Sequence, residues 1–220
     1  RTAAGAGLVL LLALQLPAAD ARRARPKPTA KEQALAALLR SGTLEQLDAA
    51  CQQLVEEGDG AALQRVQARL LSLNPAPQPL PVVLANAHVL LRCQAPQAAL
   101  QVLERYGPAP GVERRQWLLL RWQAANAGLD HGVAAAALRD LAAGELASLE
   151  ALLLPVRVNS DGTVNTRAAL DLLAAHLESL GQPRAAAEVL LASRTPGEAT
   201  ARRLAQAVAL LRELPLADQV

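Results

Sequence analysis

The sequence predicts an all-α protein assembled from helical hairpins that follow one another along the chain. Of its 220 residues, 52% are hydrophobic, and these are mostly Ala, Leu and Val, while Phe and Met are absent. Ala and Leu are strong helix formers, whereas a large β-sandwich or barrel would need more β-branched and aromatic side chains. Turn signals also return at similar intervals, which favours a repeated helical unit.

Local signals place the ends of each expected helix. Thr29–Glu32 and Thr43–Gln46 are capping boxes, in which the first and fourth side chains each accept a hydrogen bond from the other's backbone N–H. Three prolines in residues 75–79 interrupt the helical pattern, and Thr195–Glu198 reads as a third capping box with Pro196 at the first helical position. We therefore expect helices at residues 29–40, 43–57, 59–73, 81–92, 96–106, 112–127, 131–142, 145–154, 166–180, 183–193 and 196–214.

The turns between paired helices lie at Gly58, Gln94, Gly128 and Gly181, at intervals of 36, 34 and 53 residues. The first two intervals match a helical-hairpin repeat of about 34 residues. The third interval is longer because it also holds the expected helix at 145–154 and the irregular stretch after it. The spacing therefore predicts several related hairpins, one of which spans residues 177–193.

Large and small apolar residues recur at corresponding positions of these units. They are Leu47, Ala50, Cys51, Leu54, Leu70 and Pro75 around Gly58; Leu90, Ala99 and Leu103 around Gln94; Trp117, Leu120 and Ala124 around Gly128; and Leu170, Leu173, Ala174, Leu177, Ala186, Leu190 and Pro196 around Gly181. This pattern resembles the tetratricopeptide repeat (TPR) family, in which a small residue in each helix lets its neighbour approach closely.

The resemblance covers residues 43–195 with a break at 145–166, and it implies a right-handed α-solenoid within a helical-repeat domain at residues 30–214. A generic Ala- and Leu-rich bundle that mimics the pattern is the alternative. The resemblance also implies that Trp117 packs in the core and that a partner lies in the concave face. It places on that face the partner-binding residues His88, Arg92, Arg115, Trp122, Asn126, Asp171 and Glu178; for Trp122, a structural or rim role is also open.

The first residues resemble an export signal. Residues 5–16 are an apolar run that follows Arg1 and precedes Ala19 and Ala21, the small residues of an A-x-A cleavage site. Since the run is shorter than the ~20 residues of a membrane-spanning helix, we expect residues 1–21 to be a signal peptide cleaved near Ala21. The protein would then reach a periplasm, a lumen or the extracellular space. A retained membrane anchor is the alternative, with membrane association through residues 5–16.

Charge is distributed unevenly along the chain. The formal net charge is +2, but residues 1–40 carry seven basic and two acidic side chains, so the remainder has a net charge of −3. Residues 22–29 form a basic linker with two prolines. A mildly acidic body argues against nucleic-acid binding, and we expect a protein or peptide partner instead.

Cys51 and Cys93 are the only cysteines, and the three histidines are scattered along the chain. This set predicts no metal site and no cofactor. An exported chain would allow one disulfide, provided that the two Cα atoms approach within ~7 Å. We expect two small buried thiols on separate helices instead.

Residues 155–166 are the one stretch without helical character. Asp161-Gly162 lies between Val158 and Val164 and is a β-hairpin turn signal. A calcium loop would need several carboxylates at alternate positions, and Asp161 is the single one. The stretch is either a recognition loop inserted in the solenoid or a plain connector, and we expect the connector.

The chain carries no G-x-S-x-G, H-E-x-x-H or P-loop motif. Its carboxylates fall mostly on polar helix faces, where solvated charges are ordinary. We therefore expect a non-catalytic scaffold or adaptor of the cell envelope that binds a peptide or protein segment in its concave face. A membrane-anchored structural or assembly subunit of an envelope complex is the alternative, and an enzyme with an unrecognised site is a more remote one.

Overall fold

The structure, a computed structural model, describes residues 27–75, 77–107 and 110–214, and this part of the chain is mostly helical. The expected signal peptide at 1–21, and the linker as far as residue 26, lie outside the described residues. In chain order the elements are α1 (Ala30–Ser41), α2 (Leu44–Glu57), α3 (Gly60–Ser72), α4 (Leu80–Arg92), α5 (Pro96–Leu103), α6 (Val112–Ala127), α7 (His131–Ala142), the 3₁₀ helix η1 (Leu146–Glu150), β1 (Leu153–Val158), β2 (Val164–Ala168), α8 (Ala169–Ser179), α9 (Pro183–Leu191) and α10 (Glu198–Arg212).

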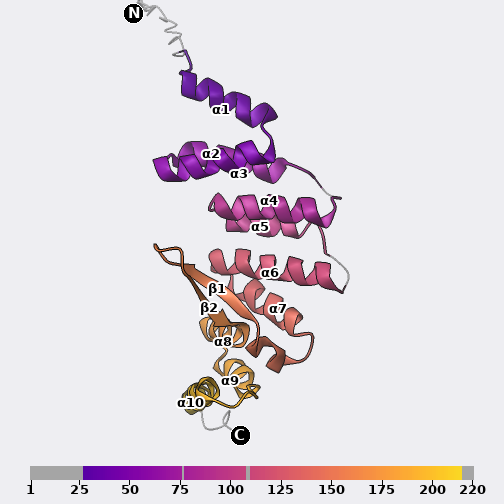
Figure 1. Ribbon diagram of the computed structural model, residues 1–220, viewed down its shortest axis with the longest axis vertical. Coiled ribbons are helices and arrows are strands. Elements are labelled where there is room, and N and C mark those ends of the chain that lie inside the picture. The colour runs from indigo at the N-terminus through magenta and orange to yellow at the C-terminus, as the bar shows by residue number, and fades with distance from the viewer. Residues whose placement is uncertain (1–26, 76, 108–109, 215–220) are drawn as a thin grey trace, which may run out of the picture.

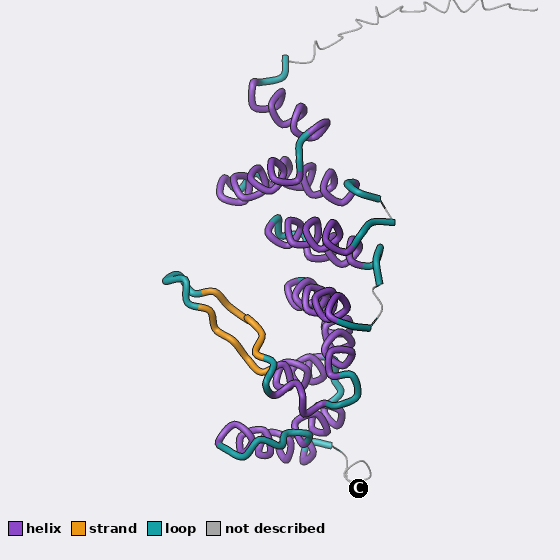
Figure 2. Tube along the Cα trace, turned by 45° about the vertical axis from the view of Figure 1, so that its right-hand side comes forward, coloured by secondary structure: helices purple, strands orange, loops and turns teal. Residues whose placement is uncertain are grey.

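The helices stack in layers along the axis of an elongated molecule, with α1 near one end and α10 at the other (Figure 1). Helix pairs α2/α3, α4/α5, α6/α7 and α8/α9 pack side by side, and α10 closes the stack against α9. Helix α4 also packs on α2, and α6 packs on α4. The strands β1 and β2 form a hairpin that projects from the side of the stack (Figure 2). The prediction of a mainly α-helical chain is confirmed.

One turn geometry joins the two helices of each pair. The residue at the bend is left-handed in all four turns, and the next residue's N–H donates to the carbonyl five positions back, which is the Schellman arrangement of a helix end. The left-handed residues are Gly58 (φ 70°), Gln94 (φ 56°), Leu129 (φ 56°) and Gly181 (φ 68°). The bonds run from Asp59 to Leu54 (3.1 Å), from Ala95 to Leu90 (2.9 Å), from Asp130 to Ala125 (2.9 Å) and from Gln182 to Leu177 (2.9 Å).

The third turn bends one residue later than expected, at Leu129 instead of Gly128. Gly128 has an ordinary φ of −89°, and its role is close packing. A Cβ there would lie 2.9 Å from Gln97 Nε2 and 3.4 Å from Pro96 Cβ. Leu129 adopts the left-handed conformation instead, which is costly for a residue with a Cβ.

Small residues bring the helices together, as the repeat pattern requires. Ala124, Ala174 and Ala186 are inaccessible to solvent, and leucines fill the space between the layers. Trp117 is 8% exposed, and its indole N–H donates to the carbonyl of Leu103 at 2.9 Å. The expectation that Trp117 packs in the core is confirmed.

The first helix starts form as expected, because their signals are local. Thr29 and Thr43 both form complete capping boxes, with Glu32 and Gln46 as their partners. Asp59 caps α3 by accepting from the N–H of Ala62 at 3.1 Å.

The break in the repeat differs from the expectation. Residues 145–154 form the short η1 and the start of β1 instead of one helix, and α8 begins only at Ala169 because residues 164–168 belong to β2. Pairing of the two strands satisfies the backbone groups that face the partner strand, and it places Leu154 in the core at 4% exposure. The stretch 155–166 thus belongs to a β-hairpin, as the Asp161-Gly162 signal indicates, and its role as a connector stays a prediction.

The third expected capping box does not form. Helix α10 begins at Glu198 with no side-chain cap. Thr195 instead donates both its N–H, at 3.1 Å, and its hydroxyl to the carboxylate of Glu150 on η1, and the N–H of Arg194 donates to the same carboxylate at 2.6 Å. Contacts with a carboxylate 45 residues away in the sequence thus take the place of the local motif.

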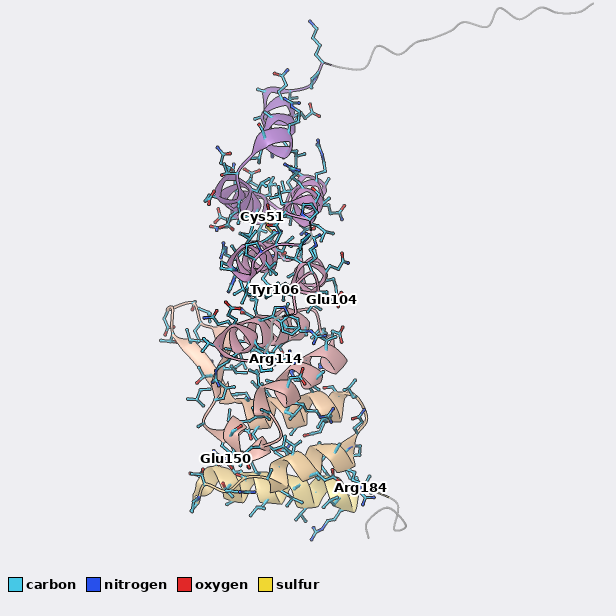
Figure 3. All side chains as sticks on the ribbon, turned by 90° about the vertical axis from the view of Figure 1, so that its right-hand side faces the viewer. Cys51, Glu104, Tyr106, Arg114, Glu150 and Arg184 are labelled. Carbon is cyan, nitrogen blue, oxygen red and sulfur yellow. A yellow bond between two sulfur atoms is a disulfide. The ribbon has the colours of Figure 1, made fainter. Side chains whose placement is uncertain are left out.

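Cys51 and Cys93 form a disulfide that joins α2 to the C-terminal end of α4. Their Cα atoms are 5.2 Å apart, and both residues are fully buried. Figure 3 shows Cys51 between the first layers of the stack. The expectation of two separate thiols is wrong because α4 packs on α2, which the sequence separation of 42 residues hides.

Arg203 of α10 is the centre of a buried ion-pair network near the other end of the stack. Its guanidinium donates to Asp171 of α8 through Nε (2.6 Å) and Nη2 (3.1 Å), and to Ser193 through Nη1 (3.1 Å). Nη1 also lies 3.7 Å from Glu150. Burial alone raises the pKa of Glu150, but the hydrogen bonds from Ser193, Thr195 and Arg194 outweigh it and lower that pKa to about 2.

We expect loss of the disulfide to lower the free energy of unfolding by about 2–4 kcal/mol, because the bond restricts a long loop of the unfolded chain. Urea denaturation of the oxidised protein and of the Cys51→Ser, Cys93→Ser double variant measures this difference. Reductant should destabilise the unaltered chain and leave the double variant unchanged. Equal midpoints for the two proteins would contradict the prediction.

We expect Arg203→Ala to cost about 3 kcal/mol of unfolding free energy, because it leaves Asp171 and Glu150 without their cationic partner in a poorly solvated site. Arg202→Ala is the matched control, since Arg202 pairs with Glu198 on the exposed side of the same helix. Its loss should cost ~0.5 kcal/mol or less. Similar effects of the two substitutions in thermal or urea denaturation would show that the network is not an anchor for α10.

Candidate interaction surface

The residues expected in a concave groove differ in their exposure. His88 and Arg92 of α4 and Arg115 of α6 are exposed. Arg92 pairs with Asp48 of α2, with 2.6 Å between Nη2 and Oδ2, and this guanidinium lowers the pKa of Asp48. The ring of His88 is bonded through Nδ1 to the carbonyl of Leu84 in its own helix at 2.9 Å. Of these side chains, Arg92 already joins two layers of the stack.

Two further residues of the expected set serve internal packing. Asp171 accepts a hydrogen bond from Arg203, and Glu178 accepts one from Gln206 Nε2 at 2.6 Å. Both acidic residues are half-buried on α8, and both partners lie on α10. These carboxylates therefore hold the last helix in place. Asn126 is also half-buried, on α6.

Trp122 is not on an accessible face. It is 2% exposed, and its indole N–H donates to Nε2 of His176 on α8 at 3.3 Å. Trp122 thus has the structural role that the sequence left open and is not an exposed interface anchor, because α8 follows the inserted segment and approaches α6 at this point. Trp122 and His176 are 54 residues apart in the sequence, and their hydrogen bond links α6 to α8.

His176 and His131 complete this link through a hydrogen bond of 3.0 Å between their Nδ1 atoms. Since Trp122 can only donate, Nε2 of His176 is an acceptor and its proton resides on Nδ1. Nδ1 of His131 must then accept, and the His176 ring is neutral. Burial, and then the nearby His131 and Arg167, lower the pKa of His176 to about 4.

The hairpin is the element that extends farthest from the helical layers (Figure 2). Its register pairs Leu153 with Ala168, Leu154 with Arg167, Pro155 with Thr166, Arg157 with Asn165 and Val158 with Val164, with a bulge at Val156. The pairing carries the strands from the base at residues 152 and 169 to the turn at residues 159–163.

The turn at the tip is held by its own side chains. The N–H of Asn159 donates to the carbonyl of Thr163 at 2.8 Å. Asp161 Oδ1 accepts from the hydroxyl of Thr163 at 2.6 Å and from its N–H at 2.9 Å, and these bonds lower the pKa of Asp161. Gly162 provides the left-handed conformation (φ 82°). The single carboxylate of the hairpin is thus used by the turn itself.

The two faces of the hairpin differ in chemistry. Side chains alternate between faces along a strand, and the bulge places Val156 and Arg157 together opposite Asn165. The face that we call the apolar face carries Leu153, Pro155, Val158, Val164, Thr166 and Ala168. The opposite face, which we call the basic face, carries Leu154, Val156, Arg157, Asn165 and Arg167.

The apolar face is open to solvent over most of its length. Leu153 is 61% exposed, Val158 67% and Val164 51%, and Val158 and Val164 are direct cross-strand neighbours. At its base this face meets a shallow pocket lined by Leu153, Ala168 and residues 195–200 around the start of α10. Clustered exposed apolar side chains of this kind often mark an interaction site.

Other kinds of site find no support in the described part of the chain. Its His, Cys, Asp and Glu side chains do not gather in any group of three that could hold a metal ion. Its helices are too short or too polar to cross a membrane. No protein-family model, no curated protein and no solved structure matches this chain.

Sequence reasoning missed the side chains that give the hairpin its two faces. The signal is the alternation in Leu153–Val158 and Val164–Ala168 on both sides of the recognised turn. A helix expected at 145–154 hid the first of these strands, and Pro155 weakened its β pattern. Arg157 and Arg167 therefore did not enter the expected site.

The neutral state of His176 predicts a pH-dependent stability. Below the ordinary histidine pKa of 6.5 the unfolded chain takes up a proton at this residue, whereas the folded chain does so only near pH 4. The contribution of His176 to the free energy of unfolding is therefore complete above pH 6.5. It decreases by about 3 kcal/mol between pH 6.5 and 4.

Urea denaturation at pH values from 7 to 5 tests this, with His176→Gln as the variant and the exposed His88→Gln as its control. His176→Gln should flatten the loss of stability over that range, and His88→Gln should retain it. An unchanged slope in His176→Gln would contradict the assignment.

Proposed function

We propose that this protein is a non-catalytic scaffold or adaptor that binds a peptide or protein segment, and that its stacked hairpins form a TPR-like, right-handed α-solenoid. The observation that carries the proposal is the projecting hairpin, which leaves Leu153, Val158 and Val164 exposed on one face. A two-stranded hairpin gains little stability by itself, so an exposed apolar face on it is better explained by a partner than by folding.

The repeated turn supports the solenoid part of the proposal. The same Schellman bond closes four helix pairs, and contacts join mainly consecutive elements. Architectures of this kind provide extended surfaces for macromolecular partners. Beside the hairpin, the exposed His88 and Arg115 of the expected concave face are available to such a partner, whereas Arg92, also exposed, is paired with Asp48.

We also propose that the protein is exported, by cleavage of a signal peptide at residues 1–21. The Cys51–Cys93 disulfide supports this localisation, because disulfides form and persist mainly in oxidising compartments. A soluble species in the periplasm, lumen or medium is the expected result of cell fractionation. A species held in the membrane would favour the anchored assembly subunit instead.

Photo-crosslinking from defined positions tests the scaffold function. A photoreactive amino acid replaces Val164 on the hairpin or His88 on α4, with Arg139 on α7 as the control position. We expect a discrete adduct with another protein from position 164 or 88, which an excess of the unlabelled purified chain abolishes by competition. No competable adduct from either position, or an equal yield from position 139, would count against a scaffold.

A further inference from the structure

The two edges of the hairpin are not equivalent. In an antiparallel pair, residues that exchange hydrogen bonds alternate with residues whose N–H and C=O groups face away from the partner strand. Bonds from Ala169 to Leu152 at the base and from Asn159 to Thr163 near the tip fix this alternation from both ends. The outward-facing residues are therefore Leu153, Pro155 and Val158 on β1, and Val164, Thr166 and Ala168 on β2.

The edge of β1 is a poor template for another strand. Pro155 has no N–H at the centre of that edge, and the bulge at Val156 bends the strand. Proline and bulges on edge strands are common devices that prevent pairing with other chains.

The edge of β2 carries neither device. Val164 and Thr166 are exposed, and within the described part of the chain no backbone hydrogen bond outside the ladder reaches either residue. Their N–H and C=O groups form a short, regular row with the spacing that an added strand requires.

We propose that the outer edge of β2 accepts an extended segment of another protein in which apolar and acidic residues alternate. This inference rests on the proposed scaffold function and names the site and the chemistry of its partner. The main chain of the segment would pair with Val164 and Thr166, which leaves its side chains alternately on the two faces of the enlarged sheet.

The side chains of the hairpin define what the segment must contain. On the apolar face its residues would lie beside Val164 and Thr166, with Val158 on the next strand. On the basic face they would lie beside Asn165 and Arg167, with Arg157 on the next strand. Two arginines on one face favour carboxylates at those positions.

The same charges disfavour a second copy of this chain as the occupant. Pairing of two β2 edges would extend both basic faces into one and bring together two copies of Arg157 and Arg167. The only carboxylate between residues 153 and 168 is Asp161, and the turn uses it. Like charges on one face of a sheet are destabilising.

Fluorescence anisotropy with a labelled seven-residue peptide, in which valine alternates with glutamate, tests the proposal on the full chain. We expect saturable binding. A peptide with lysine in place of glutamate, and one with N-methyl groups on the amides that face β2, should each bind at least about tenfold more weakly. Equal binding of all three peptides would overturn strand addition.

Two substitutions locate the site. Thr166→Pro removes one outward N–H, and it should keep the β1–β2 ladder because Thr166, like Pro155, belongs to a pair that exchanges no hydrogen bonds. It should weaken binding by about tenfold.

Arg167→Glu should reverse the preference from the glutamate peptide to the lysine peptide. Arg139→Glu on α7 makes the same charge change away from the hairpin and should not reverse the preference. If Arg167→Glu leaves the preference unchanged, the proposal fails even where Thr166→Pro proves unstable.

The result also separates this inference from the scaffold function. Competable crosslinks from position 88, combined with no binding of any peptide, would overturn strand addition and leave the scaffold intact. Dimers of the full chain that Thr166→Pro abolishes would show that the edge binds a second copy, and would also overturn the proposed partner.

Discussion

Each helix pair of the stack depends on a reversal of the backbone that must be left-handed at one residue. Gly58 and Gly181 adopt this conformation without the steric penalty of a Cβ, whereas Gln94 and Leu129 adopt it at a cost of roughly 1–2 kcal/mol. The residue after the left-handed one donates its N–H to the helix carbonyl five residues back. This bond satisfies a carbonyl that would otherwise be unpaired at the helix end. Because the reversal is so uniform, the second helix of each pair packs on the first, and buried alanines such as Ala124 and Ala174 let the next layer follow.

Sequence patterns predicted those features whose partners lie within one helical turn. The capping boxes at Thr29 and Thr43 formed because everything they need is three residues away. The same motif at Thr195 did not form: the threonine donates to Glu150, 45 residues earlier, and α10 begins only at Glu198. Cys51 and Cys93 posed the same difficulty, since only the stacking of α2 on α4 brings the sulfur atoms together.

The candidate site was predicted less well for a related reason. A resemblance between repeats assigns each helix position to an inner or outer face, and that assignment holds only where the repeat is regular. Between α7 and α8 it is interrupted, so Trp122 contacts His176 instead of solvent. The interruption contains the hairpin, and the side chains that distinguish its two faces, Arg157 and Arg167 above all, follow from a strand register that no helical pattern can reveal. Departures from local regularity are also where functional sites are expected.

The order of contacts along the chain bears on how the molecule folds during synthesis. Most contacts join consecutive elements, so each layer can dock on the one already made as the chain emerges. The Cys51–Cys93 bond needs only the first four helices, so it can lock a nucleus before the hairpin or α8 exists. Arg203, by contrast, joins residues from η1, α8 and α10, and it can act only when almost all of the domain is complete. The disulfide can thus form early and the ion pairs of Arg203 only late, which gives the assembly of this stack a direction.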